Sequence, residues 1–392
     1  MIAVWIVVGL LAAYVVAELL ARAAIRRGGW YVWAPGSRLH MHLEPGVIPS
    51  QGPFVRFEIN RDGERGDDPP ADPDAAYRVL VAGGSAVECY FLDQPQSWPE
   101  VLKRELSKPE RLAKLGRPAV HVGNVGRSLI GTEFIDLIFE RIFPRYRRLD
   151  CVVFMVGASN VVNWLMRKTP AVIPDDAPEP SEVYDLRPDG KYGFRPRRSA
   201  LRELIKRQVT LRWRPKVERR GAGKKLAAAR AMRRRAETIL VDTPDPAPML
   251  DHFERKFRAL LRRTRAKAGR VVVARQPWFD KDYDAGERAV LWHGAQGQPY
   301  VEDVKTYYDF PVVSRLMELV DARMARVAEE EGVEHLDLRS GLEHSLRTFY
   351  DFLHFTPEGA EAVGRRLAAF LAGDEAPSPG AAVPRPDAHA AR

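Results

Sequence analysis

Short apolar runs alternate with longer amphipathic segments through most of the chain. The apolar runs predict strands, and the amphipathic segments predict helices: strands at 78–82, 119–122, 151–156, 271–274 and 333–338, and helices at 97–106, 132–142, 311–331 and 359–371. Strands of this length, separated by helices, are typical of a parallel sheet that is covered on both faces. The pattern therefore predicts an α/β domain over residues 77–372.

The chain begins with an apolar stretch whose first charged side chain is Glu18. About 20 helical residues at ~1.5 Å each cover the ~30 Å hydrocarbon core of a bilayer. Two alternatives are a buried helix and a signal peptide cleaved near the small-x-small site Ala21-Arg22-Ala23. A signal peptide would have a basic first segment and a shorter apolar core. We therefore expect residues 1–22 to be a retained single-pass transmembrane anchor.

The segments on either side of the domain have different compositions. Residues 23–76 are rich in Gly, Pro, Asp and aromatic residues, and are predicted to be an irregular extension and linker. Residues 373–392 are rich in Pro and Ala and are predicted to be a disordered tail. Arg22, Arg26 and Arg27 follow the span, so the positive-inside rule places the domain in the cytoplasm.

Positive charge is concentrated in one segment of the domain, Arg195–Arg235. It holds 17 Lys and Arg against 2 acidic residues, whereas the whole chain has a net charge of +9, so the remainder carries −6. The segment is either a solvated helical insertion or a contact for anionic lipid head groups or another polyanion. No nucleic-acid-reading motif accompanies the charge, which argues against nucleic acid as a partner.

Candidate chemistry begins where the first predicted strand ends. The stretch VLVAGGSAVECYF, residues 79–91, places Ser85 at the carboxyl end of a parallel strand, where open α/β sheets bind ligands. Asp351 and His354, three residues apart, would share one face of a helical turn. A serine nucleophile needs a base and a carboxylate that orients it. These three residues are the predicted catalytic set, with a plain turn or helix cap as the alternative for Ser85.

Two further segments can supply donors for an oxyanion. GNVGRSLIGT, residues 123–132, and MVGASNVVNW, residues 155–164, each follow a predicted strand with glycine and small polar residues. A tetrahedral intermediate needs donors that converge on its negative oxygen. The expected donors are the backbone N–H groups of Ser85 and Gly126 and a side chain from 159–160.

Together, these segments resemble the SGNH (GDSL-type) hydrolase family over residues 78–372. GGSAVE corresponds to the first family block, GNVG to the second and YDFLHFTPEGA to the last, which is the most specific of them. FEINRDGERG, residues 57–66, also resembles the Asn-x-x-Gly-x-Arg-Gly segment of membrane-anchored members. The resemblance implies that Gly126 is the oxyanion glycine.

The third block departs from the family pattern Gly-x-Asn-Asp. This chain has Gly157-Ala158-Ser159-Asn160, so a strict alignment makes Ser159 the oxyanion donor. A shift by one residue makes it Asn160. We favour Asn160 because a carboxamide is an unambiguous donor with longer reach.

The resemblance implies a three-layer α/β/α flavodoxin-like fold, no metal, no organic cofactor, and ester chemistry. The predicted protein is a membrane-anchored serine ester hydrolase or O-acyl transferase acting on an acylated glycan or lipid. Anchored relatives often act outside the cytoplasm, which conflicts with the charge rule and leaves the side of the membrane open. The alternative is a non-catalytic membrane scaffold that binds anionic lipid or polymer through Arg195–Arg235.

Overall fold

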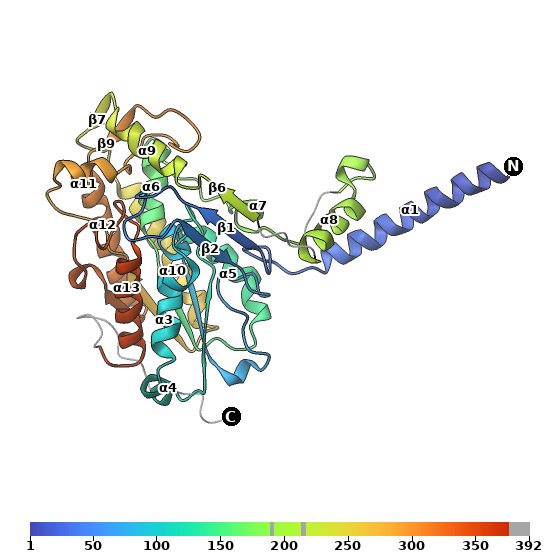
Figure 1. Ribbon diagram of the computed structural model, residues 1–392, viewed down its shortest axis with the longest axis horizontal. Helices are drawn as coiled ribbons and strands as arrows, with labels where there is room; N and C mark the ends of the chain where they lie inside the picture. Colours follow the sequence, from blue (N-terminus) through green and yellow to red (C-terminus); the bar gives the residue numbers. More distant parts are fainter. Residues whose placement is uncertain (189–191, 213–216, 376–392) are drawn as a thin grey trace.

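The computed structural model describes residues 1–188, 192–212 and 217–375, and it centres on a five-stranded parallel sheet (Figure 1). Counted along the chain, the five strands are arranged in the order 2-1-3-4-5, and each neighbouring pair is parallel. From one edge to the other they are β4 (Val120–Asn124), β3 (Tyr77–Gly83), β5 (Cys151–Met155), β8 (Arg270–Arg275) and β10 (Glu334–Asp337). This is the flavodoxin-like order, so the predicted fold class is confirmed.

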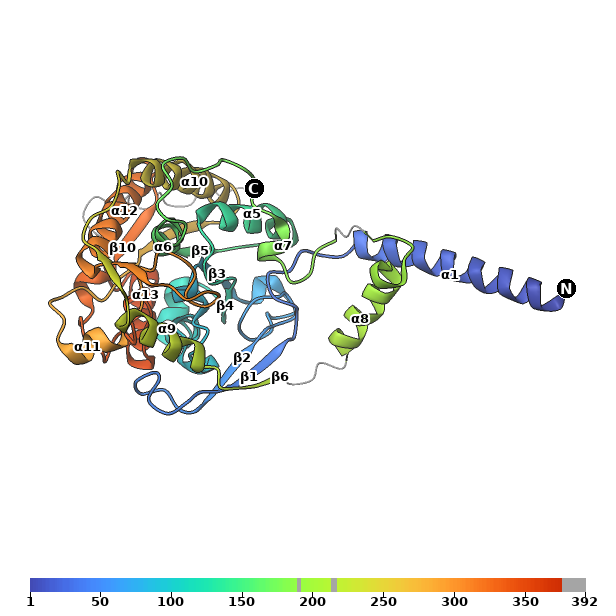
Figure 2. The ribbon, with the colours of Figure 1, turned by 90° about the horizontal axis from the view of Figure 1, so that it is seen from above.

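Helices cover both faces of the sheet and complete three layers (Figure 2). One layer contains α3 (Trp98–Leu106) and α13 (Pro357–Leu371), and the other contains α5 (Thr132–Ile142), α10 (Ala247–Arg265) and α12 (Phe310–Glu330). Helix α13 begins as its sequence suggests: the Thr356 side chain accepts a hydrogen bond from the backbone N–H of Gly359 at 3.1 Å, and Pro357 is the first helical residue. The shorter helices are α2 (Ser85–Glu88), α4 (Pro109–Leu115), α6 (Ala158–Met166), α7 (Pro180–Val183) and α11 (Ala285–Val290).

The extension at 23–76 is not irregular throughout, contrary to the sequence-based expectation. Strands β1 (Arg38–His42) and β2 (Phe54–Glu58) form an antiparallel pair, and β6 (Val217–Arg220) adds to β1 in parallel. A separate pair joins β7 (Thr238–Leu240) to β9 (Thr306–Tyr308). Strands β1 and β2 bury Met41, Val55 and Phe57 beneath the domain surface. Their five-residue length and flanking Gly and Pro hide them in the sequence.

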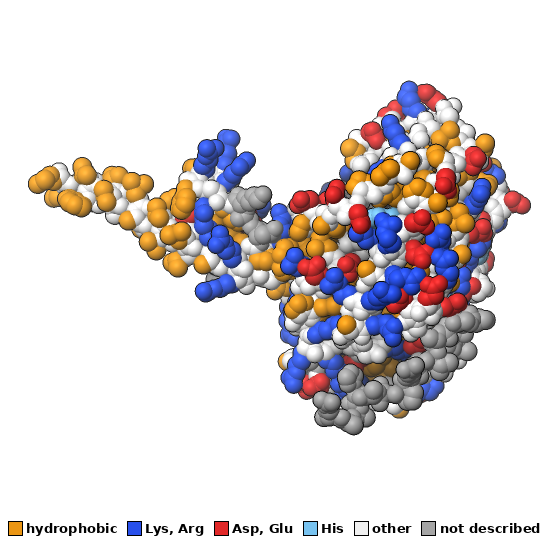
Figure 3. Space-filling view, turned by 180° about the vertical axis from the view of Figure 1, so that it is seen from behind, with side chains coloured by type: hydrophobic (Ala, Val, Ile, Leu, Met, Phe, Trp, Pro, Cys, Tyr) orange, Lys and Arg blue, Asp and Glu red, His pale blue; other side chains and the backbone are white. Residues whose placement is uncertain are grey.

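Helix α1 (Ile2–Arg26) extends away from the domain, with hydrophobic side chains along its length (Figure 3). Only 6% of its apolar window is buried, whereas the core helix of a soluble protein is mostly buried. By length and composition it can cross a membrane, as can a signal sequence. The predicted tail at 373–392 lies, from residue 376 onward, outside the described residues.

The basic segment Arg195–Arg235 is divided between two places in the fold. Helix α8 (Ala200–Arg212) packs against the carboxyl end of α1, and its Lys and Arg side chains cluster there (Figure 3). Helix α9 (Lys224–Arg234) packs against the domain, where Arg230 and Arg233 are buried. Part of the positive charge of this segment therefore lies inside the protein, at α9.

Glu18 joins α1 to α8. Its carboxylate is fully buried and accepts hydrogen bonds from the Ser199 hydroxyl at 2.6 Å and from the backbone N–H groups of Ala200 at 2.7 Å and Leu201 at 3.0 Å. A carboxylate that binds the first free N–H groups of a helix caps it and is favoured by the helix dipole. Glu18 therefore holds the first turn of α8 against the carboxyl-terminal part of α1.

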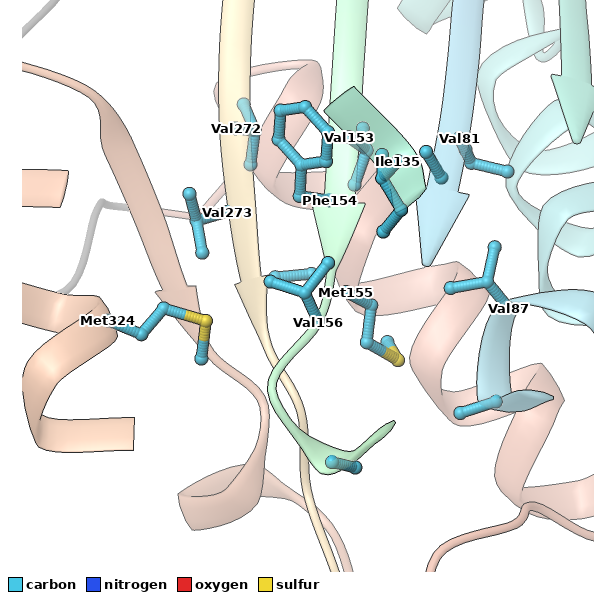
Figure 4. Packing of buried hydrophobic residues seen from close by; sticks show 14 of the residues in the cluster. Val81, Val87, Ile135, Val153, Phe154, Met155, Val156, Val272, Val273 and Met324 are labelled. Atoms are coloured by element: carbon cyan, nitrogen blue, oxygen red, sulfur yellow. The ribbon is translucent and has the colours of Figure 1, made fainter. Parts of the chain in front are cut away.

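The main core lies between the sheet and the helices on its two faces. Figure 4 shows Val153 and Phe154 of β5 and Val272 and Val273 of β8 in this core, with Ile135 of α5 near Phe154 and Met324 of α12 near Val273. Fully burying a side chain of this size contributes about 1.5–3 kcal/mol. This packing holds the carboxyl ends of the strands in fixed positions, and the candidate site lies at those ends.

Candidate active site

Ser85 lies where the sequence places it, at the carboxyl end of β3. Gly84 is the N-cap of α2, and Ser85 is its first helical residue. The residue before Gly84, Gly83, must also be a glycine. A Cβ on Gly83 would lie 2.1 Å from the carbonyl oxygen of Met155 on the neighbouring strand. The Ser85 N–H has no acceptor within its own helix, as in any first turn. Cys89, one turn later, is buried, and burial raises the pKa of its thiol to about 11, so it is not a second nucleophile.

The structure brings the three predicted side chains together across more than 260 residues of sequence. Ser85 Oγ lies 2.7 Å from His354 Nε2. On the other side of the ring, His354 Nδ1 lies 2.8 Å from Asp351 Oδ2 and 2.9 Å from Oδ1. With the ring proton on Nδ1 facing the carboxylate, Nε2 accepts from the serine hydroxyl. This arrangement can remove a proton from Ser85 and make its oxygen nucleophilic.

Asp351 and His354 do not lie on a helical turn, which corrects the geometry expected from their spacing. Residues 351–354 form a bend that precedes α13. Asp351 Oδ1 accepts hydrogen bonds from the backbone N–H groups of Leu353 at 2.9 Å and His354 at 3.0 Å, and this local turn replaces the helix. The Tyr350 ring stacks on the His354 ring with centroids 5.4 Å apart and an angle of 10°.

Asp351 is held as a carboxylate. Burial would raise its pKa, but the charges of His354 and His293 and the hydrogen bonds from His354 and Leu353 hold the pKa of that carboxyl well below its usual range. The indole N–H of Trp292 also donates to Asp351 Oδ2 at 2.9 Å. The carboxylate is therefore ionised at neutral pH and fixed in orientation, which suits a group that must stabilise an imidazolium.

His293 is a second histidine beside this arrangement. It is 2% exposed, and its ring centroid lies 5.6 Å from that of His354. His293, Asp351 and His354 place one ligand atom each within 4.8 Å of one another, a spacing that metal sites use. Both ring nitrogens of His354 are already hydrogen bonded, to Asp351 and to Ser85. The cluster as it stands is arranged for proton transfer rather than for holding a metal.

Sequence reasoning missed the residues that support the site. Trp292 is 59 positions from Asp351, and no motif links the two. In the sequence, Arg65 stands out only as part of the segment FEINRDGERG, residues 57–66. It is buried and donates to the carbonyl oxygens of Glu88 at 2.6 Å, Cys89 at 2.7 Å and Leu92 at 2.7 Å. Arg65 therefore braces the backbone that follows the nucleophile helix.

Gly126 lies beside the nucleophile helix, but its N–H group is already used. It donates to the Asn124 side-chain oxygen at 2.7 Å, and the same Asn124 amide donates to the Val87 carbonyl at 2.7 Å. A Cβ on Gly126 would lie 2.6 Å from the Glu88 nitrogen, so only glycine allows this close approach. The structure gives Gly126 a packing role, and its part in an oxyanion hole stays a prediction.

Ser159 and Asn160 lie on the first turn of α6, after Gly157 with its positive φ of 102°. A Cβ on Gly84 would lie 2.3 Å from Ser159 Oγ, so the Ser159 hydroxyl packs against the backbone beside the nucleophile. Asn160 faces the next loop, where a Cβ on Gly131 would lie 2.9 Å from Asn160 Nδ2. These positions favour Ser159 over Asn160 as the nearer donor, in line with the strict alignment.

Comparison with known proteins yields only distant likenesses. No family model matches the chain, and no curated protein matches its sequence. Similar solved structures include an acetylxylan esterase from Geobacillus stearothermophilus, with 11% identity and a TM-score of 0.40 over 77% of this chain and 97% of that one. An alpha/beta hydrolase from the metagenome of Lake Arreo, Spain, has 13% identity and a TM-score of 0.39 over 77% and 97%. A lipolytic G-D-S-L family member from Veillonella parvula has 9% identity and a TM-score of 0.38 over 75% and 96%.

Proposed function

We propose that this protein is a membrane-anchored serine ester hydrolase or O-acyl transferase of the SGNH (GDSL-type) family. The observation that carries the proposal is the continuous hydrogen-bonded series from Asp351 through His354 to Ser85, at 2.8 Å and 2.7 Å. The series is built on a buried, ionised carboxylate at the carboxyl edge of a parallel sheet. These groups are what acyl transfer through a serine requires.

The first half of the proposed reaction forms an acyl-enzyme. His354 Nε2 takes the hydroxyl proton while Ser85 Oγ attacks the acyl carbon, and the carbonyl oxygen becomes an oxyanion. The intermediate collapses, the bond to the alcohol breaks, and His354 returns the proton to the departing alkoxide. Asp351 holds the imidazolium in place throughout these steps.

The second half releases the acyl group. Water, or a hydroxyl of an acceptor, attacks the acyl carbon of the acyl-enzyme while His354 removes its proton. The bond between the acyl carbon and Ser85 Oγ then breaks, and His354 returns the proton to Ser85 Oγ. Water gives a carboxylic acid and therefore hydrolysis, whereas a sugar hydroxyl gives a new ester and therefore transfer. Acylated glycans and lipids are both proposed as substrates, because the anchor keeps the site close to a membrane.

The proposed oxyanion donors are the Ser85 N–H and a side chain from Ser159 or Asn160. Removing one such donor costs roughly 10²–10³ in rate. Because Ser159 packs beside Gly84, we expect Ser159→Ala to show this loss and Asn160→Ala a smaller one at a simple ester. The reverse result would restore Asn160 as the donor.

The membrane part of the proposal concerns α1 and α8. Helix α1 is proposed to span the bilayer, and α8 is proposed to lie at the surface where the span ends, with its cations facing anionic lipid head groups. The docking of α8 on α1 through Glu18 supports this position. The contribution of Arg195–Arg235 to lipid contact is thereby restricted to the α8 half of the segment.

The test is covalent labelling of the detergent-solubilised full chain with a fluorophosphonate. We expect labelling of the wild type and of the surface control Ser340→Ala, and none of Ser85→Ala. Turnover of p-nitrophenyl acetate should fall by several orders of magnitude in Ser85→Ala and His354→Ala. Absence of labelling and turnover in the wild type would leave the non-catalytic membrane scaffold as the better interpretation.

A further inference from the structure

A cavity of about 380 Å³ opens beside the candidate active site. It is lined by residues of α5, α6 and α10 and by the segment after α6: Glu133, Asn160, Asn163, Trp164, Arg167, Pro170, Val172, Ile173, Pro174, Met249 and His252. A volume in this range suits a small ligand or one to two sugar rings. No step of the proposed acyl transfer uses these residues, apart from the alternative donor Asn160.

Three polar atoms on the wall of this cavity are buried without a partner among the described residues. They are Glu133 Oε2, Asn160 Oδ1 and His252 Nδ1, and His252 is only 7% exposed. A buried polar atom that makes no hydrogen bond costs about 1–3 kcal/mol, so native structures rarely leave several together. Because these three atoms line one cavity, a ligand that enters it could hydrogen bond to all of them.

The cavity and the nucleophile contact the same helix, α6. Gly84, next to Ser85, packs against Ser159 Oγ, whereas the following residue on α6, Asn160, faces Gly131 and the cavity. One turn of α6 therefore touches the backbone of the nucleophile on one side and the cavity on the other. A substrate with its acyl carbon at Ser85 can extend its remaining part into this space.

We propose that the cavity is a subsite for a sugar ring of an acylated glycan, an inference that rests on the proposed ester chemistry. Two of the unpartnered atoms, on Glu133 and Asn160, are acceptors, so the ligand must bring hydroxyl or amide donors. The lining also includes the apolar side chains of Val172, Ile173 and Met249. A pyranose matches both kinds of lining, since it has hydroxyl groups at its edge and C–H groups on its faces.

The main competing occupant is the acyl chain of a lipid. An alkyl chain would cover Glu133, Asn160 and His252 without giving any of them a hydrogen bond. It would also place a carboxylate in an apolar contact, which is unfavourable unless the carboxylate is paired. The polar wall therefore selects a glycan over a long acyl chain in this cavity.

The first experiment separates binding in the cavity from chemistry at Ser85. In the full chain, kcat/KM is measured for an O-acetylated methyl glucoside and for p-nitrophenyl acetate, in wild type, Glu133→Gln and His252→Phe. Loss of one hydrogen bond to a charged or buried group is worth about tenfold or more. We expect the ratio of the two kcat/KM values to fall at least tenfold in each variant, mainly through KM for the sugar.

The matched control is Glu110→Gln, which changes another first-turn glutamate on an exposed helix end away from the cavity. It should leave the ratio as in wild type. An unchanged ratio in both cavity variants, or an equal loss on both substrates, would overturn the sugar subsite. A gain in p-nitrophenyl octanoate turnover with no loss on the sugar ester would assign the cavity to an acyl chain instead.

The second experiment does not depend on turnover. Methyl glucoside, methyl xyloside and methyl N-acetylglucosaminide are titrated onto the full-length Ser85→Ala chain by saturation-transfer NMR. We expect at least one to bind, and to bind at least tenfold more weakly when Glu133→Gln is added. Sugar binding without any ester turnover in wild type would remove the hydrolase and keep the subsite. Ester turnover without sugar binding would remove the subsite and keep the hydrolase.

Discussion

Helices α8 and α9 are neighbours in one basic segment, yet they occupy opposite environments. On α9, Arg230 donates to the carbonyl oxygens of Val290 at 3.0 Å, Val47 at 2.7 Å and Tyr350 at 2.7 Å, and Arg230 is 7% exposed. On α8, the only fully buried residue whose burial is described is Ala200, and Ile205 and Val209 are more than half exposed. Cations of one basic segment are therefore buried in the domain on α9, whereas every described residue of α8 other than Ala200 is partly or fully exposed.

The number of charged residues in a segment does not tell whether their side chains are buried or exposed. A guanidinium has five N–H donors in a fixed plane, so several backbone carbonyls can pay for its burial. Arg230 links the extension, the segment before Trp292 and the residue before Asp351 in this way. Among the described side chains of α8, Arg207 donates to one backbone carbonyl, that of Arg187 at 3.1 Å, and the start of the helix is held by Glu18. The partners of a cation, and not its density in the sequence, decide its role.

The largest effect is expected on α9. Arg230→Ala leaves three carbonyls without their donor, at roughly 1–3 kcal/mol for each one that stays buried, so we expect a loss of about 3–5 kcal/mol in the free energy of unfolding. The α8 variant Lys206→Ala should stay within about 0.5 kcal/mol of wild type. Urea unfolding of the solubilised full chain measures both. Equal effects would contradict the difference in environment between the two helices.

His293 gives a pH-dependent test of the region around α9. Burial lowers the pKa of His293 to about 3, Asp351 opposes this, and His354, Arg233 and Arg230 lower it further. The unfolded chain has a histidine pKa near 6.5, so between about pH 6.5 and 3 it binds one proton more than the folded chain. Stability therefore falls as the pH falls through this window.

Between pH 7 and pH 5 this group should cost the wild type about 2 kcal/mol of unfolding free energy. The variant His293→Gln has no such proton uptake, so its stability should fall by that much less over the same interval. Urea midpoints at both pH values measure the difference. Parallel loss in the two proteins would mean that His293 titrates normally in the folded state.

The strands of the main sheet and the residues at their ends were predictable from the sequence, because a short continuous segment encodes each of them. The apolar runs predicted all five strands of the main sheet, and the predicted helix at 132–142 has the same bounds as α5. Ser85 was predicted from its place at a strand end, and Asp351 and His354 from their spacing of three residues, and the structure brings the three side chains together. The pairing of β1 with β6 was not predictable, since it joins segments about 180 residues apart through strands of four and five residues.

The surroundings of the site were less predictable, because they depend on side chains that meet only in three dimensions. Nothing near Trp292 indicates that its N–H points at Asp351. Whether the Gly126 N–H is free depends on the Asn124 rotamer, which spacing does not determine. Likewise, the sequence shows Glu18 only as the first charge after an apolar stretch, whereas in the structure it caps a helix that begins 182 residues later.

A smaller effect on stability is expected where α8 packs against α1. Glu18→Ala removes the acceptor for the first N–H groups of α8, and loss of a cap costs about 1 kcal/mol, within a range of roughly 0.5–2. Hydrogen exchange of the α8 amides in the full chain should therefore accelerate severalfold. Glu203→Ala, which removes only an i,i+4 pair with Arg207, is the control and should change exchange less. An equal change in both would mean that Glu18 does not hold the helix.

The smallest effect concerns the contact of α8 with lipid. An environment-sensitive dye on Ile205→Cys, placed in the full chain in nanodiscs, should report a less polar surrounding with anionic lipid than with neutral lipid. The same dye on Ile239→Cys of β7, which is also partly exposed, should report no difference.

Each basic residue near an anionic surface contributes about 1 kcal/mol, and the attraction fades within a Debye length of roughly 8–10 Å. Lys206→Gln should therefore shift the Ile205→Cys signal by about fivefold in apparent occupancy, and high salt should abolish it. A signal that is the same with both lipids would mean that α8 faces water, and that its cations serve only to keep the helix soluble beside the anchor.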